Sequence, residues 1–155
     1  AHSSYDRLFG DKGATEVACW AHLRRKVYDA RDTEKEKADL LLALIGRLYD
    51  IERKLKEENA PPEEIVEART TKAKPVLGVI HSHLVEYKGT VLPSSPFGKA
   101  VTYGLNQWKA LNVYLTDARL SIDNNEAERQ MKHVVIGRKN YLFVGSDDGG
   151  DRAAV

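Results

Sequence analysis

The stretch EKEKADLLLALIGRLYDIERKLKEEN, from Glu34 to Asn59, decides the fold of this chain. Its apolar residues recur at alternating three- and four-residue spacings, the period of one face of an α-helix. This inner face comprises Leu41, Leu44, Leu48, Ile51 and Leu55, widened by Leu42, Ile45 and Tyr49. The pattern is heptad-like but too short for a sustained coiled coil, so it predicts packing within the chain rather than a dimer zipper.

A second long helix is predicted after Pro61 and Pro62, which break the first one. Glu63 and Glu64 favour a new helix N-terminus, and the helix should continue to about Tyr87. Its inner face comprises Val76, Leu77, Ile80, Leu84 and Tyr87. Pro75 should kink or interrupt this helix. The two helices most simply form an antiparallel hairpin.

The segments on either side of this hairpin predict further elements. A third amphipathic helix carries Phe97, Val101, Leu105, Trp108, Leu111 and Leu115. Residues 15–20 are apolar enough for a buried strand, residues 21–30 favour a helix, and residues 140–144 favour a second short strand. Strands that bracket a helical middle predict an α/β fold that is mostly helical.

Composition narrows the class of protein. The 155 residues suffice for one compact domain, and 24 Lys and Arg side chains nearly balance 23 Asp and Glu. Any nucleic-acid binding must therefore come from local clusters of basic residues. One cysteine excludes an intramolecular disulfide, and neither a membrane span nor a signal peptide is present, so we expect a cytoplasmic protein with no membrane partner.

The most distinctive polar stretch is IDNNEAERQMK, from Ile122 to Lys132. Asp123 is suited to be a helix N-cap, and Glu126 three residues later would complete a capping box. Glu128 then has no capping role, although it shares a helix face with Met131 and Val135. A carboxylate beside an apolar stripe must be hydrated, paired or bound to a metal. An ordinary ion pair with Lys132 is the plainer alternative, and the pattern alone leaves both open.

Two basic clusters are candidates for contact with phosphate groups. The first is Arg24, Arg25 and Lys26, and the second is Arg129, Lys132, His133, Arg138 and Lys139. Either cluster is also compatible with a solvated helix face. Zinc is not expected, because Cys19 and His22 supply only two ligands and His81 and His83 point to different sides of a helix.

Three segments together resemble a known family. They are CWAHLRRK from Cys19, FGKAVTYGLNQWKAL from Phe97, and LSIDNNEAERQMKHVVIGRKNYLFVGSDDGG from Leu120. They resemble the C-terminal part of bacterial transposases of the insertion sequence sixty-six family, and the likeness covers nearly the whole chain. It is weakest over the helical hairpin. Lys132 departs from the arginine that the family usually has there.

The resemblance implies a DDE transposase, whose ribonuclease-H-like domain cuts and joins DNA with an Asp-Asp-Glu triad and two Mg²⁺ ions. Glu128 matches the triad glutamate and would be a catalytic metal ligand. Both family aspartates would fall before Ala1, so the chain alone is expected to be inactive. Residues 1–30 and 117–155 would form a partial ribonuclease-H-like core, and residues 31–116 a helical insertion.

The same resemblance implies DNA as partner, both transposon ends and target, and a homo-oligomer in the complete complex. The side chains expected to bind DNA are Arg24, Arg25, Lys26, Arg129, Lys132, Arg138 and Lys139, with Asp123, Asn124 and Asn125 in support. The alternative function is a non-catalytic helical module that binds DNA or a protein partner.

Overall fold

A computed structural model describes residues 16–125 of the chain. The chain divides into two compact units at the Asp123–Asn124 boundary, and the helices described below all belong to the first unit. Within residues 16–123 the secondary structure is helical and contains no strand. The expectation of a mostly helical chain is therefore confirmed.

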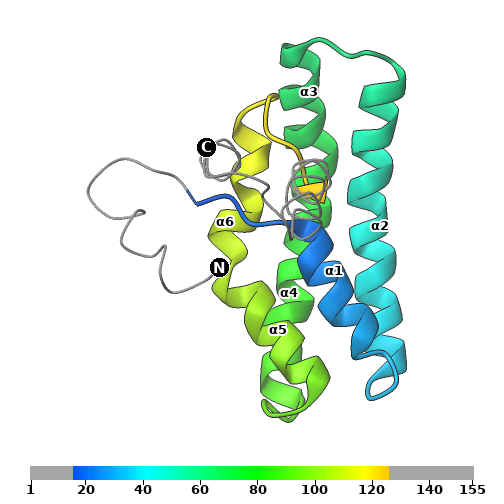
Figure 1. The fold of residues 1–155 in the computed structure, drawn as a ribbon, viewed down its shortest axis with the longest axis vertical. Helices are drawn as coiled ribbons and strands as arrows, with labels where there is room; N and C mark the ends of the chain where they lie inside the picture. Colours follow the sequence, from blue (N-terminus) through cyan, green and yellow to red (C-terminus); the bar gives the residue numbers. More distant parts are fainter. Residues whose placement is uncertain (1–15, 126–155) are drawn as a thin grey trace, which may run out of the picture. The chain divides into compact units, whose positions relative to one another are not determined.

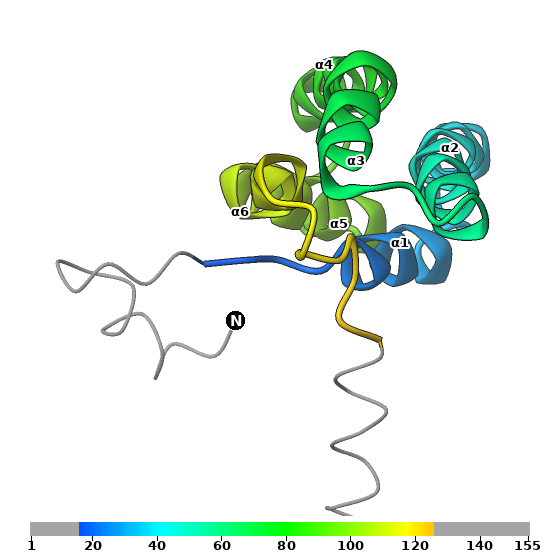
Figure 2. The same cartoon turned by 90° about the horizontal axis from the view of Figure 1, so that it is seen from above.

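Four helices form the body of the first unit (Figure 1). They are α1 (Trp20–Asp29), α2 (Lys35–Glu57), α4 (Lys74–Thr90) and α5 (Pro96–Asn106). Helix α1 packs on α2 and α5, and α4 packs on the same two neighbours, so α1 and α4 lie diagonally across a four-helix bundle. Figure 2 looks down this bundle and shows α1 and α4 on opposite sides. Burial of one apolar stripe per helix stabilises such an arrangement.

The inner face predicted for residues 34–59 is the face that α2 buries. Leu41, Ile45 and Leu48 are at most 1% exposed, and Leu44 and Leu55 are also buried. The helix ends where Asn59 adopts a left-handed backbone conformation with φ of 49°. Asparagine tolerates this conformation better than most residues, and the Ala60 N–H caps the helix by donating to the Leu55 carbonyl at 3.0 Å.

The second predicted helix exists but is not uniformly α-helical. It begins as α3 (Pro62–Ala68), widens into the π-helical turn η2 (Arg69–Ala73), and continues as α4. Pro75 has no N–H to donate, and its ring crowds the carbonyl four residues earlier. The interruption expected at Pro75 is thus observed in the turn just before it. Helix α2 packs on both η2 and α4, which confirms the predicted hairpin.

The third predicted helix is divided into three pieces, α5, α6 (Trp108–Asn112) and the 3-10 helix η3 (Val113–Thr116). Ser95 caps α5 by accepting a hydrogen bond from the Gly98 N–H at 3.0 Å, and Pro96 follows in the first turn. Phe97, Val101 and Leu111 are buried as expected. The break at Gln107 turns the end of this segment away from the α5 axis (Figure 1).

The strand expected at residues 15–20 is a wrong prediction over its described part. Residues 16–19 are extended without a partner strand, and Trp20 is already the first residue of α1. The Ala18 N–H donates to the Ala110 carbonyl at 3.1 Å, and the Trp20 N–H to the Ile122 carbonyl at 3.2 Å. Helix and loop carbonyls therefore satisfy the donors that a sheet would otherwise pair. The strand expected at residues 140–144 lies outside the described residues.

Two glycines offer a matched test of this packing. A Cβ at Gly98 would lie 2.2 Å from the Leu92 carbonyl oxygen, whereas a Cβ at Gly78 would meet no atom within 4 Å. We expect Gly98→Ala to destabilise the fold by about 1–3 kcal/mol through overpacking. Gly78→Ala, at an exposed position inside α4, should stabilise it by about 0.5–1 kcal/mol. The urea midpoints of both variants measure this, and equal shifts would contradict the described packing.

Candidate functional site

A single buried charge organises one end of the bundle. Arg69, in the π-helical turn, is 2% exposed and is the one buried charged side chain among residues 16–125. Its Nε and Nη2 atoms donate to the two carboxylate oxygens of Glu52 on α2, at 2.9 and 2.7 Å. This is the bidentate geometry that makes arginine–carboxylate pairs strong. The pair joins the two arms of the helical hairpin.

The other donors of Arg69 reach the segment that follows α6. Nη1 donates to the carbonyls of Tyr114 and Asp117 at 2.6 and 2.9 Å, and Nη2 donates to the Leu120 carbonyl at 3.0 Å. A guanidinium has five N–H groups, so every donor has a partner. Burial of this cation is tolerable because all its hydrogen bonds are satisfied.

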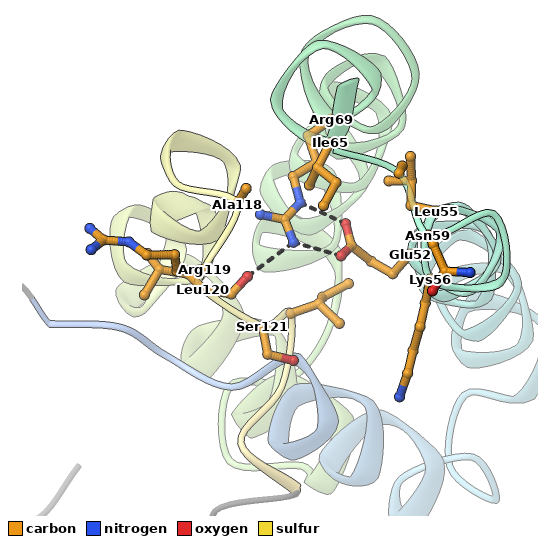
Figure 3. Close-up of a pocket in the computed structure, with 12 residues that line it drawn as sticks. Glu52, Leu55, Lys56, Asn59, Ile65, Arg69, Ala118, Arg119, Leu120 and Ser121 are labelled. Carbon is orange, nitrogen blue, oxygen red and sulfur yellow. Dashed lines mark hydrogen bonds and ion pairs between the residues drawn. The ribbon is translucent and has the colours of Figure 1, made fainter. Parts of the chain in front are cut away.

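An open hollow of about 500 Å³ lies beside this ion pair (Figure 3). Its walls come from α2, α3 and the loop after η3, and they include Leu55, Ile65, Leu120 and Ile122. Arg69 and Glu52 are joined by their ion pair and line the hollow together, whereas Arg119 points away from them. The Arg119 guanidinium and backbone N–H bind Asp117 and lower the pKa of that carboxyl to about 2.

A second set of contacts holds the same loop from the side of α1. Trp20 is fully buried, and its indole Nε1 donates to the Leu111 carbonyl at 2.8 Å. Its ring packs edge-on against Trp108 with 6.0 Å between centroids. Together with the bond from the Trp20 backbone to Ile122, these contacts place the start of α1 against the residues that lead into Asp123.

The Tyr49 hydroxyl lies at this junction. Burial raises the pKa of Tyr49, and the neighbouring Asp123 carboxylate raises it further, while Arg24 acts in the opposite direction. Asp123 and Arg24 thus each lie close enough to the Tyr49 hydroxyl to influence its pKa. The structure therefore brings together one residue of the first basic cluster and one residue of the polar motif, although they are far apart in the sequence.

The first basic cluster covers the outer surface of α1. Arg24, Arg25 and Lys26 are all exposed, while Leu23 and Val27 point into the core. Lys26 lies over the Tyr103 ring, 5.0 Å from its centroid, and Arg25 is 3.8 Å from Asp29 in an exposed ion pair. Such an exposed pair contributes little to the free energy of unfolding, and Arg25 can readily exchange Asp29 for another anion. This surface can hold phosphate groups.

The other predicted site residues divide into two groups. Asn124 and Asn125 are exposed, and the backbone of Asn125 is helical. Glu128, Arg129, Lys132, Arg138 and Lys139 lie outside the described residues. Among residues 16–125 no group of three or more His, Cys, Asp or Glu side chains gathers where a metal ion could bind.

Arg69 and Glu52 were not among the site residues predicted from the sequence. The sequence does contain an indication of this pair. Arg69 lies four residues after Ile65 and four before Ala73, so it shares the apolar face of its helix. Glu52 similarly lies between Leu48 and Leu55 on the inner side of α2. A charge inside an apolar stripe indicates a buried pair, but the pattern does not name its partners.

Comparison with known proteins agrees with the resemblance seen in the sequence. The family model described as Transposase IS66 family matches residues 1–152. This chain belongs to that family. Its curated relatives include three uncharacterized proteins of Sinorhizobium fredii, and no solved structure matches it.

These relatives of the IS66 family chain are much longer than it is. The protein y4jD is 35% identical over 138 residues, which are 88% of this chain and 27% of the relative. The protein y4hP is 33% identical over 154 residues, which are 91% of this chain and 28% of the relative. The chain thus spans about a quarter of their length. No helix between residues 16 and 125 has the length and apolar character to cross a membrane.

Two acidic residues of α2 test the importance of the Arg69 pair. Glu52→Ala would leave a buried guanidinium short of two acceptors, and we expect it to destabilise this IS66 family chain by about 3–5 kcal/mol. Asp50→Ala removes an exposed partner of Arg53 at 2.8 Å and should cost less than about 1 kcal/mol. Urea unfolding of both variants measures the difference. Similar midpoints would show that Arg69 is not buried against Glu52.

Proposed function

We propose that this chain is part of the catalytic region of a DDE transposase, which cleaves DNA and transfers strands in a Mg²⁺-dependent reaction. The observation that carries the proposal is the 3.2 Å bond from the Trp20 N–H to the Ile122 carbonyl. It joins the basic helix α1 to the residues that enter the IDNNEAER motif. This bond supports the proposal because the start of the basic helix contacts the first residue of the proposed catalytic motif.

The basic surface of α1 suits the sugar–phosphate backbone of DNA. Its three cations are exposed on one short helix, and Arg24 is near enough to Tyr49 to influence the pKa of that hydroxyl. Contacts of Lys and Arg with phosphates position a protein on DNA without reading its sequence. We therefore propose that α1 binds the DNA backbone close to the strand that is cleaved and transferred.

Glu128 is the carboxylate that we propose for catalysis, with Arg129, Lys132, Arg138 and Lys139 as further DNA contacts. Five residues separate Glu128 from Asp123, so covalent geometry limits the distance between their Cα atoms to about 18 Å. This reach supports a shared role for α1 and Glu128. The transposon ends and target DNA are the proposed substrates, and a homo-oligomer is the proposed assembly.

The proposed Mg²⁺ ions need more carboxylates than the described residues offer. Residues 16–125 contain no cluster suited to a metal ion, and the family's two aspartates would come from sequence preceding Ala1. When bound, Mg²⁺ would activate a nucleophile and stabilise charge on the phosphate. The contribution proposed for this chain is one ligand, Glu128, and the phosphate-binding surface.

The ribonuclease-H-like architecture is likewise a proposal. Residues 1–30 and 117–155 would belong to that core, with residues 31–116 as its helical insertion. In the described bundle α1 packs on α2 and α5. A helix that we assign to the ribonuclease-H-like core therefore packs its apolar side chains against helices of the insertion. We infer that the two parts fold together.

A non-catalytic helical module that binds DNA or a protein is the second candidate. It is favoured by the self-contained core of residues 16–123, in which the largest buried side chains come from all four bundle helices. The two candidates differ in their need for Glu128. Binding would survive its substitution, whereas strand transfer would not.

Substitution of Glu128 tests the enzyme directly. In the full-length transposase that carries this sequence, Glu128→Gln should reduce Mg²⁺-dependent strand transfer to background while DNA binding persists, because an amide is a poor ligand for Mg²⁺. Glu126→Gln, in the same motif, is the matched control and should keep most activity. Undiminished strand transfer by Glu128→Gln would refute the assignment.

The basic surface of α1 can be tested by salt dependence. Replacing Arg24, Arg25 and Lys26 with glutamine should weaken DNA binding and reduce the slope of log K against log salt by about one per lost phosphate contact. The control replaces Lys72, Lys74 and Lys88, which are exposed on the diagonal side of the bundle. Fluorescence anisotropy measures both slopes, and equal losses in the two variants would indicate non-specific charge effects.

A further inference from the structure

The loop between η3 and the proposed catalytic motif has no regular structure to hold its shape. After η3 ends at Thr116, residues 117–124 contain turns and extended backbone without a helix. A segment of this kind normally presents carbonyls to water or to neighbouring side chains. Here the carbonyls of Asp117 and Leu120 in the loop, and that of Tyr114 in η3 just before it, all accept from the Arg69 guanidinium.

Arginine is the side chain that this geometry requires. Its planar guanidinium offers donors in several fixed directions, so one side chain binds a carboxylate and three carbonyls together. Lysine has three donors on one nitrogen and could not reproduce the five bonds. Glu52 fixes the orientation of the guanidinium through its two oxygens. The position of the loop is therefore set by a pair that comes from the helical hairpin.

The stretch from Leu111 to Ile122 is anchored at both of its ends. Trp20, at the start of α1, donates to the carbonyls of Leu111 and Ile122. Arg69, in the helical hairpin, binds the residues between them. The residue after this doubly anchored stretch is Asp123, and Glu128 follows five residues later. The anchored stretch is thus joined to the motif by only a few residues of chain. Displacements of about 1 Å can reduce turnover about a hundredfold.

We propose that Arg69, oriented by Glu52, is a positioning residue that holds residues 114–120 so that the Glu128 motif is presented to the reaction centre. The inference rests on the proposed function, because it gives the loop a catalytic purpose. Arg69 itself does not touch substrate. The helical hairpin, whose likeness to the family is weakest, thereby contributes to catalysis through one side chain.

Amide exchange of this chain tests the anchoring without any enzymatic assay. Arg69→Lys should accelerate hydrogen exchange in residues 114–122 and leave the middle of α2 protected. The control is Leu41→Ala, which creates a cavity in the core eleven residues before Glu52, about 16 Å away along α2. That control should not loosen the loop selectively. Unchanged exchange of residues 114–122 in Arg69→Lys would overturn the proposal.

Turnover in the full-length transposase separates positioning from simple stability. At a temperature where each variant is folded, Arg69→Lys should lower strand transfer at saturating DNA by about 10- to 100-fold while the Kd for DNA is nearly unchanged. Leu41→Ala should leave both values near those of the wild type. If turnover instead follows the unfolding midpoint across the variants, Arg69 is only structural and the proposal fails.

A double variant makes the distinction sharper. Replacing the pair with apolar side chains, Glu52→Leu with Arg69→Met, should recover much of the stability lost in the single variants. It cannot recover the three bonds to the loop, so turnover should stay low. Recovery of turnover together with stability would overturn the positioning role. A wild-type enzyme without strand transfer, or an active Glu128→Gln variant, would instead overturn the proposed function and the catalytic meaning given to Arg69.

Discussion

The burial of the Arg69 guanidinium is the constraint on which the rest of this structure depends. A cation at 2% exposure is stable only if its hydrogen bonds are made inside the protein. Glu52 supplies the counter-charge and two acceptors, and three carbonyls of residues 114–120 supply the others. The fold must therefore bring α2, the π-helical turn and the loop after η3 to one point. Apolar packing alone would leave their relative placement less strictly determined.

Under the proposed function, this constraint is how the helical bundle contributes to a reaction at the motif that follows Asp123. The bundle holds the loop before Asp123 from two sides, through Arg69 and through Trp20. At the same junction α1 begins, with its exposed basic residues. Given its IS66 family membership, we propose that these features have a common purpose, because a transposase would hold phosphates close to its catalytic carboxylates. We propose that the helices set the geometry and that the motif after Asp123 takes part in the reaction.

The helices could be predicted from the sequence because burial repeats with the helical period. Leu41, Leu48 and Leu84 were assigned to inner faces by spacing alone, and each is buried. The strand at residues 15–20 was predicted wrongly because a short apolar run does not reveal whether its backbone donors find another strand. Ala110 and Ile122, remote in the sequence, accept those hydrogen bonds instead. The local pattern of apolar residues does not reveal acceptors that lie so far away in the sequence.

The candidate site was accessible to sequence reasoning only in part. The basic residues of α1 were found and are exposed, as a DNA-binding surface requires. Arg69 could not be identified from the sequence because three of its acceptors lie 45 to 51 residues downstream and are backbone atoms, which have no sequence signature. The role of Glu128 rests on family likeness. Its residue pattern by itself is equally compatible with an ion pair to Lys132.

The state of the Arg69 guanidinium can be observed directly by nuclear magnetic resonance with labelled arginine. If all five N–H groups are bound as described, the Nε–H and the Nη hydrogens should give separate signals at neutral pH. These signals should exchange slowly with water and show contacts to Tyr114 and Leu120. A single averaged signal in fast exchange with water, like that of an exposed arginine such as Arg119, would contradict the central claim.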